Sequence, residues 1–251
     1  MKRIALFGVI LAAALSSSAF AAVDTAALTA SLQNPGRSDA DKARDVTSKP
    51  VEVVKLLDIG PGMTVIDLIA AGGYNSEVLS YAVGPKGHVY AQNPKFVLEY
   101  RDGANEKALS ARLAGNRLPN VERLDREVAD FGLAPDSIDA AITVLNYHDI
   151  YNRPDGPAAA QGFLAVVFKF LKPGGVFGII DHIGVAGADN TKLHRIPEAL
   201  VIEQAKQAGF VIAADSDLLH SATDDHTLPV FDPSIRGGTD RFLLVLRKPA
   251  Q

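Results

Sequence analysis

The chain has 251 residues, of which 47% are hydrophobic, and its 29 acidic residues outnumber its 25 basic ones for a formal net charge of −4. This composition supplies a sizeable core, and an acidic balance without a basic cluster argues against a nucleic-acid partner. The absence of cysteine excludes disulfides, a thiol nucleophile and thiolate metal ligands.

Residues 1–21 predict a secretory signal peptide. Lys2 and Arg3 give a positively charged start, the stretch 4–15 is almost wholly apolar, and Ala19 and Ala21 form a small-residue cleavage site. The apolar stretch is shorter than the roughly 20 residues that a membrane-spanning helix needs. We therefore expect a periplasmic or secreted protein that has no membrane contact after cleavage.

The rest of the chain predicts a lead-in over residues 22–49, with one or two short helices, and an α/β domain over residues 50–251. Apolar runs in the domain alternate with helical segments, which indicates a doubly wound, mostly parallel sheet with helices on both faces. Strands are expected at 63–68, 88–92, 121–124, 138–146, 176–180, 210–214 and 241–247, and helices at 50–57, 75–83, 96–114, 162–171 and 197–208. The helix at 96–114 has an expected interruption at Gly103.

The turn after the first expected strand runs over residues 67–73 and leads into a helix that Asn75 or Ser76 can cap. Open parallel sheets bind ligands beyond the carboxyl ends of their strands. Small residues in such a turn let the backbone approach a ligand, and the N–H groups at a helix start suit a carboxylate.

The order of these and later features resembles the class I S-adenosylmethionine-dependent methyltransferases over about residues 50–248. The resemblance is carried by the acid Asp67 ending the first strand, Gly-Pro-Lys-Gly at 84–87, Asp139 opening the fourth strand, Leu-Lys-Pro-Gly-Gly at 171–175 and Ala-Gly-Phe at 208–210. It implies a Rossmann-like sheet of seven strands, with the last antiparallel and inserted between the fifth and sixth. It also implies S-adenosylmethionine as the cofactor and methyl transfer to a small-molecule substrate.

The glycine motif of that family is altered in this chain. Its acid and three alternate glycines fall on Asp67, Ile69, Ala71 and Gly73. A β-branched residue such as Ile69 does not comfortably take a positive φ. We therefore expect either a turn of different shape or a different position for the methionine end of the cofactor.

Two further residues are assigned to the cofactor by the same resemblance. Asn93 follows the second strand, where the family carries an acid that accepts hydrogen bonds from both ribose hydroxyls. Asparagine has only one acceptor oxygen, so we expect weaker ribose binding. Asn146, at the end of the fourth strand, is the second.

Five of the six histidines lie beyond strand ends on the expected ligand side. Histidine exchanges protons near neutral pH, and a carboxylate can orient it. The fourth and fifth strands are neighbours in the family's sheet, so we assign base and orienter roles to the residues at their ends. These catalytic candidates are His148, Asp149, Asp181 and His182, and the substrate candidates are Tyr147, His194, Arg195 and His226. The plainer alternative is that these side chains anchor loops, cap carbonyls or pack in a wall.

Two other functions stay open. An exported, non-enzymatic protein that binds a small ligand would explain both the altered glycine motif and the leader. A metal-dependent enzyme would draw its ligands from His148, Asp181, His182, His194 and His226. No spacing matches a metal motif such as His-Glu-x-x-His, so we assign no metal ligand. Nothing in the sequence indicates an oligomeric state.

Overall fold

The structure of the chain is a computed structural model that describes residues 20–250. The strands are β1 (Thr64–Leu68), β2 (His88–Gln92), β3 (Val121–Leu124), β4 (Ile138–Val144), β5 (Leu171–His182), β6 (Val211–Ser216) and β7 (Arg241–Arg247). The helices are α1 (Thr25–Leu32), α2 (Asp39–Ser48), α3 (Pro50–Leu56), α4 (Tyr74–Val83), α5 (Lys95–Leu113), α6 (Tyr147–Tyr151), α7 (Gly156–Phe170), α8 (Asn190–Leu193) and α9 (Glu198–Gln207). The predicted leader lies almost wholly outside the described residues.

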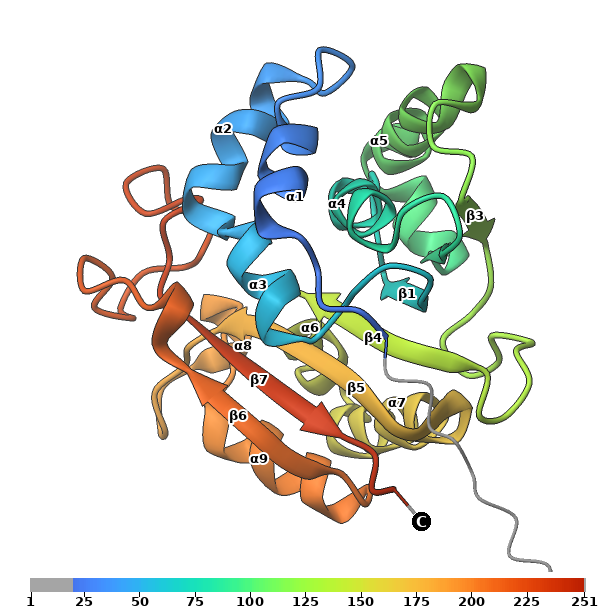
Figure 1. Ribbon diagram of the computed structural model, residues 1–251. Coiled ribbons are helices and arrows are strands. Elements are labelled where there is room, and N and C mark those ends of the chain that lie inside the picture. The colour runs from blue at the N-terminus through green and yellow to red at the C-terminus, as the bar shows by residue number, and fades with distance from the viewer. Residues whose placement is uncertain (1–19, 251) are drawn as a thin grey trace, which may run out of the picture.

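The strands form one seven-stranded sheet in the order β3-β2-β1-β4-β5-β7-β6 (Figure 1). The pairs from β3 through to β5 are parallel, whereas β7 runs antiparallel to both β5 and β6. The predicted doubly wound sheet is therefore confirmed, including the last strand inserted between the fifth and sixth. The order reverses between β1 and β4, so ligands are expected at the carboxyl ends of these two strands.

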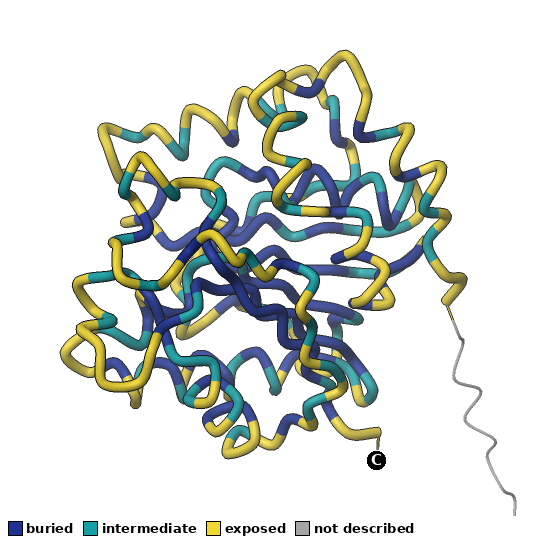
Figure 2. Tube along the Cα trace, turned by 90° about the vertical axis from the view of Figure 1, so that its left-hand side faces the viewer, coloured by how far each residue is buried: buried dark blue, intermediate teal, exposed yellow. Residues whose placement is uncertain are grey.

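Helices cover both faces of the sheet, as its apolar strands require. Core residues of α6, α7 and α9 pack on one face, and those of α1, α3 and α4 pack on the other (Figure 1). Figure 2 shows the strands as the most continuously buried part of the chain. A near-continuous apolar strand such as β4 is the pattern of a parallel sheet that is covered on both sides.

Several predicted boundaries differ from the structure for local reasons. The helix α4 begins at Tyr74 with Gly73 as its N-cap, so neither Asn75 nor Ser76 is the cap. The strand β5 begins at Leu171, and the glycine-rich turn is its irregular start, where the register against β4 shifts. The helices α6 and α8 have five and four residues, too few to show a periodic pattern in sequence. The interruption of α5 is confirmed, because Tyr100 to Gly103 have non-helical backbone angles.

A buried ion cluster ties the N-terminal segment to the domain. Glu77 of α4 is fully buried, and its carboxylate accepts hydrogen bonds from Arg112, Arg117 and Tyr81. Arg37, from the turn between α1 and α2, approaches the same carboxylate to 4.0 Å. The Glu77 carboxylate thus lies near three cations: Arg37 between α1 and α2, Arg112 on α5 and Arg117 after α5.

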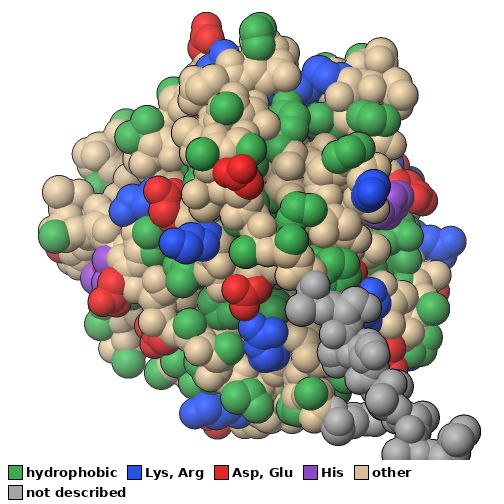
Figure 3. All heavy atoms as spheres, viewed as in Figure 1, with side chains coloured by type: hydrophobic (Ala, Val, Ile, Leu, Met, Phe, Trp, Pro, Cys, Tyr) green, Lys and Arg blue, Asp and Glu red, His purple; other side chains and the backbone are tan. Residues whose placement is uncertain are grey.

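The face of the molecule seen in Figure 3 has Lys and Arg side chains interspersed with Asp and Glu side chains. No broad area of a single sign is seen on that face. Within residues 20–250, none of the helices combines the length and the apolar character that crossing a membrane requires.

Replacing Glu77 by Gln should destabilise the protein by about 1.5–3 kcal/mol, because Arg117 loses its carboxylate partner while Arg112 and Arg37 keep Asp41 and Asp45. Urea melts measure this loss as a change in the free energy of unfolding. The matched control is Glu106→Gln, which breaks the more exposed pair with Arg123 and should have a much smaller effect. Equal losses in the two variants would contradict a special role for the buried cluster.

Candidate active site

Two residues of the turn after β1 that are not glycine adopt left-handed backbone angles. Ile69 has φ +57° and Ala71 has φ +50°. Such angles cost a non-glycine residue about 1–2 kcal/mol each. The prediction that Ile69 would avoid a positive φ is therefore wrong, and the turn keeps the left-handed angles that glycine usually supplies.

Two amide side chains at the end of β2 explain how this turn is held. The Gln92 side-chain oxygen accepts a hydrogen bond from the Ile69 N–H at 3.0 Å, and the Asn93 oxygen accepts one from the Ala71 N–H at 2.8 Å. The Asn93 amide also donates to the Ala71 carbonyl at 3.2 Å. We call this arrangement of Gln92 and Asn93 the amide clamp.

The clamp changes the expected role of Asn93. Its side chain is fully buried, and both its oxygen and its nitrogen are bonded to the backbone of Ala71. These atoms are directed into the protein, so the predicted contact of Asn93 with a ribose is not what the structure shows. The physical reason is that these hydrogen bonds hold Ala71, which is not glycine, at its left-handed backbone angle.

Asp67 and Gly73 also serve the interior. Asp67 is buried, and its carboxylate accepts a hydrogen bond from the Ser76 hydroxyl at 2.6 Å. A side chain at Gly73 would meet Leu109 of α5 at 2.7 Å, so this glycine permits the close packing of α5 on the turn. We predicted both residues to contact the cofactor, but in the structure Asp67 bonds to α4 and Gly73 packs against α5.

A cleft of about 380 Å³ lies beyond the ends of β1 and β4. Its lining residues are Ile69, Phe96, Val97, Asn146, Asp149, Ile150 and Arg153. The volume lies within the range of small-ligand sites. Ile69 and Asn146 were predicted as cofactor residues, and the Asn146 amide also donates to the Ile69 carbonyl at 3.3 Å. The apolar lining residues Phe96, Val97 and Ile150 were missed, and their position just after strand ends is the signal that points to them.

The ends of β4 and β5 meet as predicted. The His148 Nδ1 atom lies 2.7 Å from an Asp181 oxygen, and the His148 backbone N–H donates to the other oxygen at 2.8 Å. The His182 ring lies 5.6 Å from the His148 ring, and its Nδ1 atom pairs with the Thr239 hydroxyl at 2.8 Å. The sequence-predicted group of His148, Asp181 and His182 is therefore assembled at one edge of the sheet.

These neighbouring imidazoles differ in protonation. Burial by itself lowers the pKa of His148, but the carboxylates of Asp181 and Asp149 outweigh it and raise this pKa to about 10. Burial lowers the pKa of His182 to about 4, since Asp181 only partly opposes it. At neutral pH, His148 is thus positively charged and His182 is neutral.

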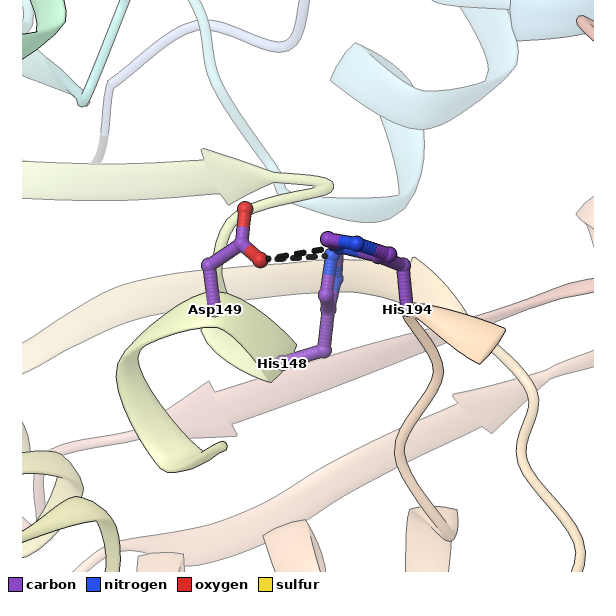
Figure 4. A group of neighbouring side chains, drawn as sticks. All are labelled: His148, Asp149 and His194. Atoms are coloured by element: carbon purple, nitrogen blue, oxygen red, sulfur yellow. Dashed lines mark hydrogen bonds and ion pairs between the residues drawn. The ribbon is translucent and has the colours of Figure 1, made fainter. Parts of the chain in front are cut away.

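His194 joins this group from the loop after β5. One Asp149 oxygen lies 3.3 Å from the His148 Nε2 atom and also 3.3 Å from the His194 Nδ1 atom (Figure 4). The ring of His194 is 5.8 Å from that of His148 and packs against Phe231. Of the four predicted substrate residues, His194 is the one that contacts the catalytic candidates.

Tyr147 and Arg195, which we predicted to bind substrate, lie in the interior of the protein. Tyr147 is fully buried, and its hydroxyl donates to Gln204 of α9 at 2.6 Å. Arg195 is also fully buried and forms a two-pronged pair with Asp224 at 2.8 and 2.9 Å. Their polar atoms are used within the protein, so neither can contact a ligand in the cleft.

His226 lies in the loop before β7, where its Nε2 atom pairs with Asp240 at 2.8 Å. The Asp240 backbone N–H in turn donates to Asp224, the partner of Arg195. His226 therefore belongs to the ion pairs that hold this loop together, and nothing places it at the cleft.

No family model matches the sequence. The chain is similar in fold to solved structures that include an S-adenosylmethionine-dependent methyltransferase from Aquifex aeolicus, at 19% identity and a TM-score of 0.60 over 90% of this chain and 98% of that one. The fold is that of the class I S-adenosylmethionine-dependent methyltransferases.

Two further neighbours show what this fold carries elsewhere. An arsenic(III) S-adenosylmethionine methyltransferase from Chlamydomonas reinhardtii matches at 17% identity and a TM-score of 0.52, over 75% of this chain and 64% of that one. The cyclase SpnF matches at 15% identity and a TM-score of 0.60, over 92% of this chain and 98% of that one. The shared fold thus carries proteins named for different reactions, so the reaction of this chain has to be argued from its site.

The buried carboxylate of Asp67 should make stability depend on pH. Burial raises the pKa of Asp67 from 3.8 to about 6, although Ser76 favours the charged form. A raised pKa in the folded state stabilises at low pH, and the benefit is lost as the pH rises through 6. The unfolding free energy of the wild type minus that of Asp67→Asn should fall by about 3 kcal/mol between pH 3 and 7.

Urea melts at several pH values measure this difference. Replacing Ser76 by Ala removes the hydrogen bond to the charged form and should move the fall to higher pH. A difference that stays constant with pH would contradict the raised pKa.

Proposed function

We propose that the chain is an S-adenosylmethionine-dependent methyltransferase that acts on a small molecule. The observation that carries the proposal is the cleft at the carboxyl ends of β1 and β4, the place where sheets of this kind bind ligands. The similarity to methyltransferase structures supports it.

The lining of the cleft fits the cofactor in size and polarity. Phe96 and Ile150 offer apolar walls for the flat adenine, while Asn146 and Arg153 offer polar groups at the same opening. The bound cofactor supplies an electrophilic methyl group on a sulfonium. Because the Asn93 amide is bonded within the turn, we expect the ribose to be held less firmly than by a free carboxylate.

The proton of the acceptor would be handled by Asp149, which lines the cleft, and by His148 and His182, which lie behind Asp149. His182 is neutral at neutral pH, so it can take a proton, and its low pKa makes it a weak base. Asp149 lines the cleft and, together with the His148–Asp181 pair behind it, would orient the acceptor. This arrangement suits an acceptor that gives up its proton readily.

Calorimetric titration with S-adenosylmethionine and with S-adenosylhomocysteine tests the proposal. We expect micromolar binding, about −8 kcal/mol. Replacing Arg153 by Ala should weaken this binding about tenfold through loss of a charged contact. The matched control Lys172→Ala removes a cation at the opposite end of β5 and should leave the affinity unchanged.

Absence of both heat and thermal shift at millimolar concentrations of either ligand would contradict the proposal. The non-enzymatic binding protein would then be the function to pursue. An equal loss of affinity in the Arg153 and Lys172 variants would show that the ligand binds away from the cleft.

A further inference from the structure

We propose that His148, Asp149 and His194 form a binding site for a divalent transition-metal cation, with zinc the ion that best suits their donor atoms. The proposal does not rest on methyl transfer, because it concerns three side chains and an ion alone. Imidazole nitrogen and carboxylate oxygen are donors that zinc takes in its catalytic sites, often from three protein ligands.

The spacing of the donor atoms is that of ligands around one ion. Two atoms bound to a tetrahedral zinc at about 2.0–2.1 Å lie about 3.4 Å apart. The Asp149 oxygen lies 3.3 Å from the His148 Nε2 atom and 3.3 Å from the His194 Nδ1 atom. All three donor atoms lie within 4.8 Å of one another.

The His148 Nε2 atom is an independent indication of a ligand. The side chain is only 3% exposed, and among the described residues its Nε2 atom makes no hydrogen bond of good geometry, the Asp149 oxygen at 3.3 Å being its polar neighbour. Figure 4 shows it directed into the space between Asp149 and His194. Asp181 and Asp149 hold a proton on this ring at neutral pH, so a bound zinc ion would displace the Nε2 proton and take its place beside the Asp149 carboxylate.

Asp181 supplies the support that metal-binding histidines usually have. It lies 2.7 Å from the His148 Nδ1 atom, on the side of the ring away from the cluster, and it is fully buried. Such a carboxylate fixes the orientation of the ring and makes the other nitrogen a better donor. In this role Asp181 is a positioning residue for the proposed site.

The site can be reached from solvent and opens toward the cleft. The side chains of Asp149 and His194 are 61% and 39% exposed, and Asp149 also lines the cleft. Three protein ligands leave at least one coordination position for a further donor. A small molecule with an oxygen donor would occupy this position. Such a molecule could also be a methyl acceptor.

Other histidines in the described part of the chain lack this arrangement. His88 pairs with Glu122 alone, His220 with Asp217 alone and His226 with Asp240 alone. Over residues 20–250, the group of His148, Asp149 and His194 is the one in which three such side chains converge.

Titration of the chelator-stripped, tag-free protein with zinc chloride tests the site. We expect one equivalent to bind with a Kd of about 1 µM or tighter. The variants Asp149→Asn and His194→Ala should each weaken binding about 100-fold, and both replace partly exposed side chains, so they should fold. The matched control His88→Ala removes a histidine with a single carboxylate partner and should bind zinc as the wild type does.

Binding weaker than about 100 µM would overturn the proposal. So would unchanged affinity in both the Asp149 and His194 variants, since zinc would then bind elsewhere. Titrating the same preparations with S-adenosylmethionine separates the two proposals. Zinc binding without cofactor binding would contradict the methyltransferase and leave the metal site standing, and the reverse result would overturn the metal site alone.

Discussion

The hydrogen bonds that Gln92 and Asn93 make to the turn after β1 are the constraint on which the candidate site depends. Each holds one residue of the turn at a left-handed angle that glycine would adopt without strain. A net hydrogen bond contributes about 1 kcal/mol, the same order as the strain at each residue. The Ile69 carbonyl of this turn accepts a hydrogen bond from the Asn146 amide, and both residues line the cleft.

The amide clamp affects how a ligand can bind at the end of β2. Asn93, the residue that follows β2, is fully buried and clamps the turn, so its side chain does not face solvent where a ribose would bind. The polar side chains that could act on a ligand lie instead at the ends of β4 and β5, where Asp181 positions His148 beside Asp149 and His194. The chain therefore combines a familiar fold with a cleft whose recognition groups come from different strands.

The sequence predicted the fold well because its signals are local. The strands β2, β3 and β7 agree with the predicted bounds, since turn residues or charged residues delimit each apolar run. The meeting of His148 with Asp181 followed from topology, because the ends of neighbouring parallel strands must lie together. The roles of Tyr147 and Arg195 could not be predicted, since sequence position does not show that their polar atoms meet Gln204 and Asp224. The angle of Ile69 was missed for a similar reason, because its partner comes from another strand.

The amide clamp can be tested at the two backbone N–H groups that it holds. Hydrogen exchange measured by NMR should show the Ile69 and Ala71 amides protected to about the level of the β1 amides, because both are bonded to buried side chains. In Asn93→Ala, protection should be lost at Ala71 first. Exchange of both amides in the wild type at the rate of an open loop would contradict a clamped turn and the site built on it.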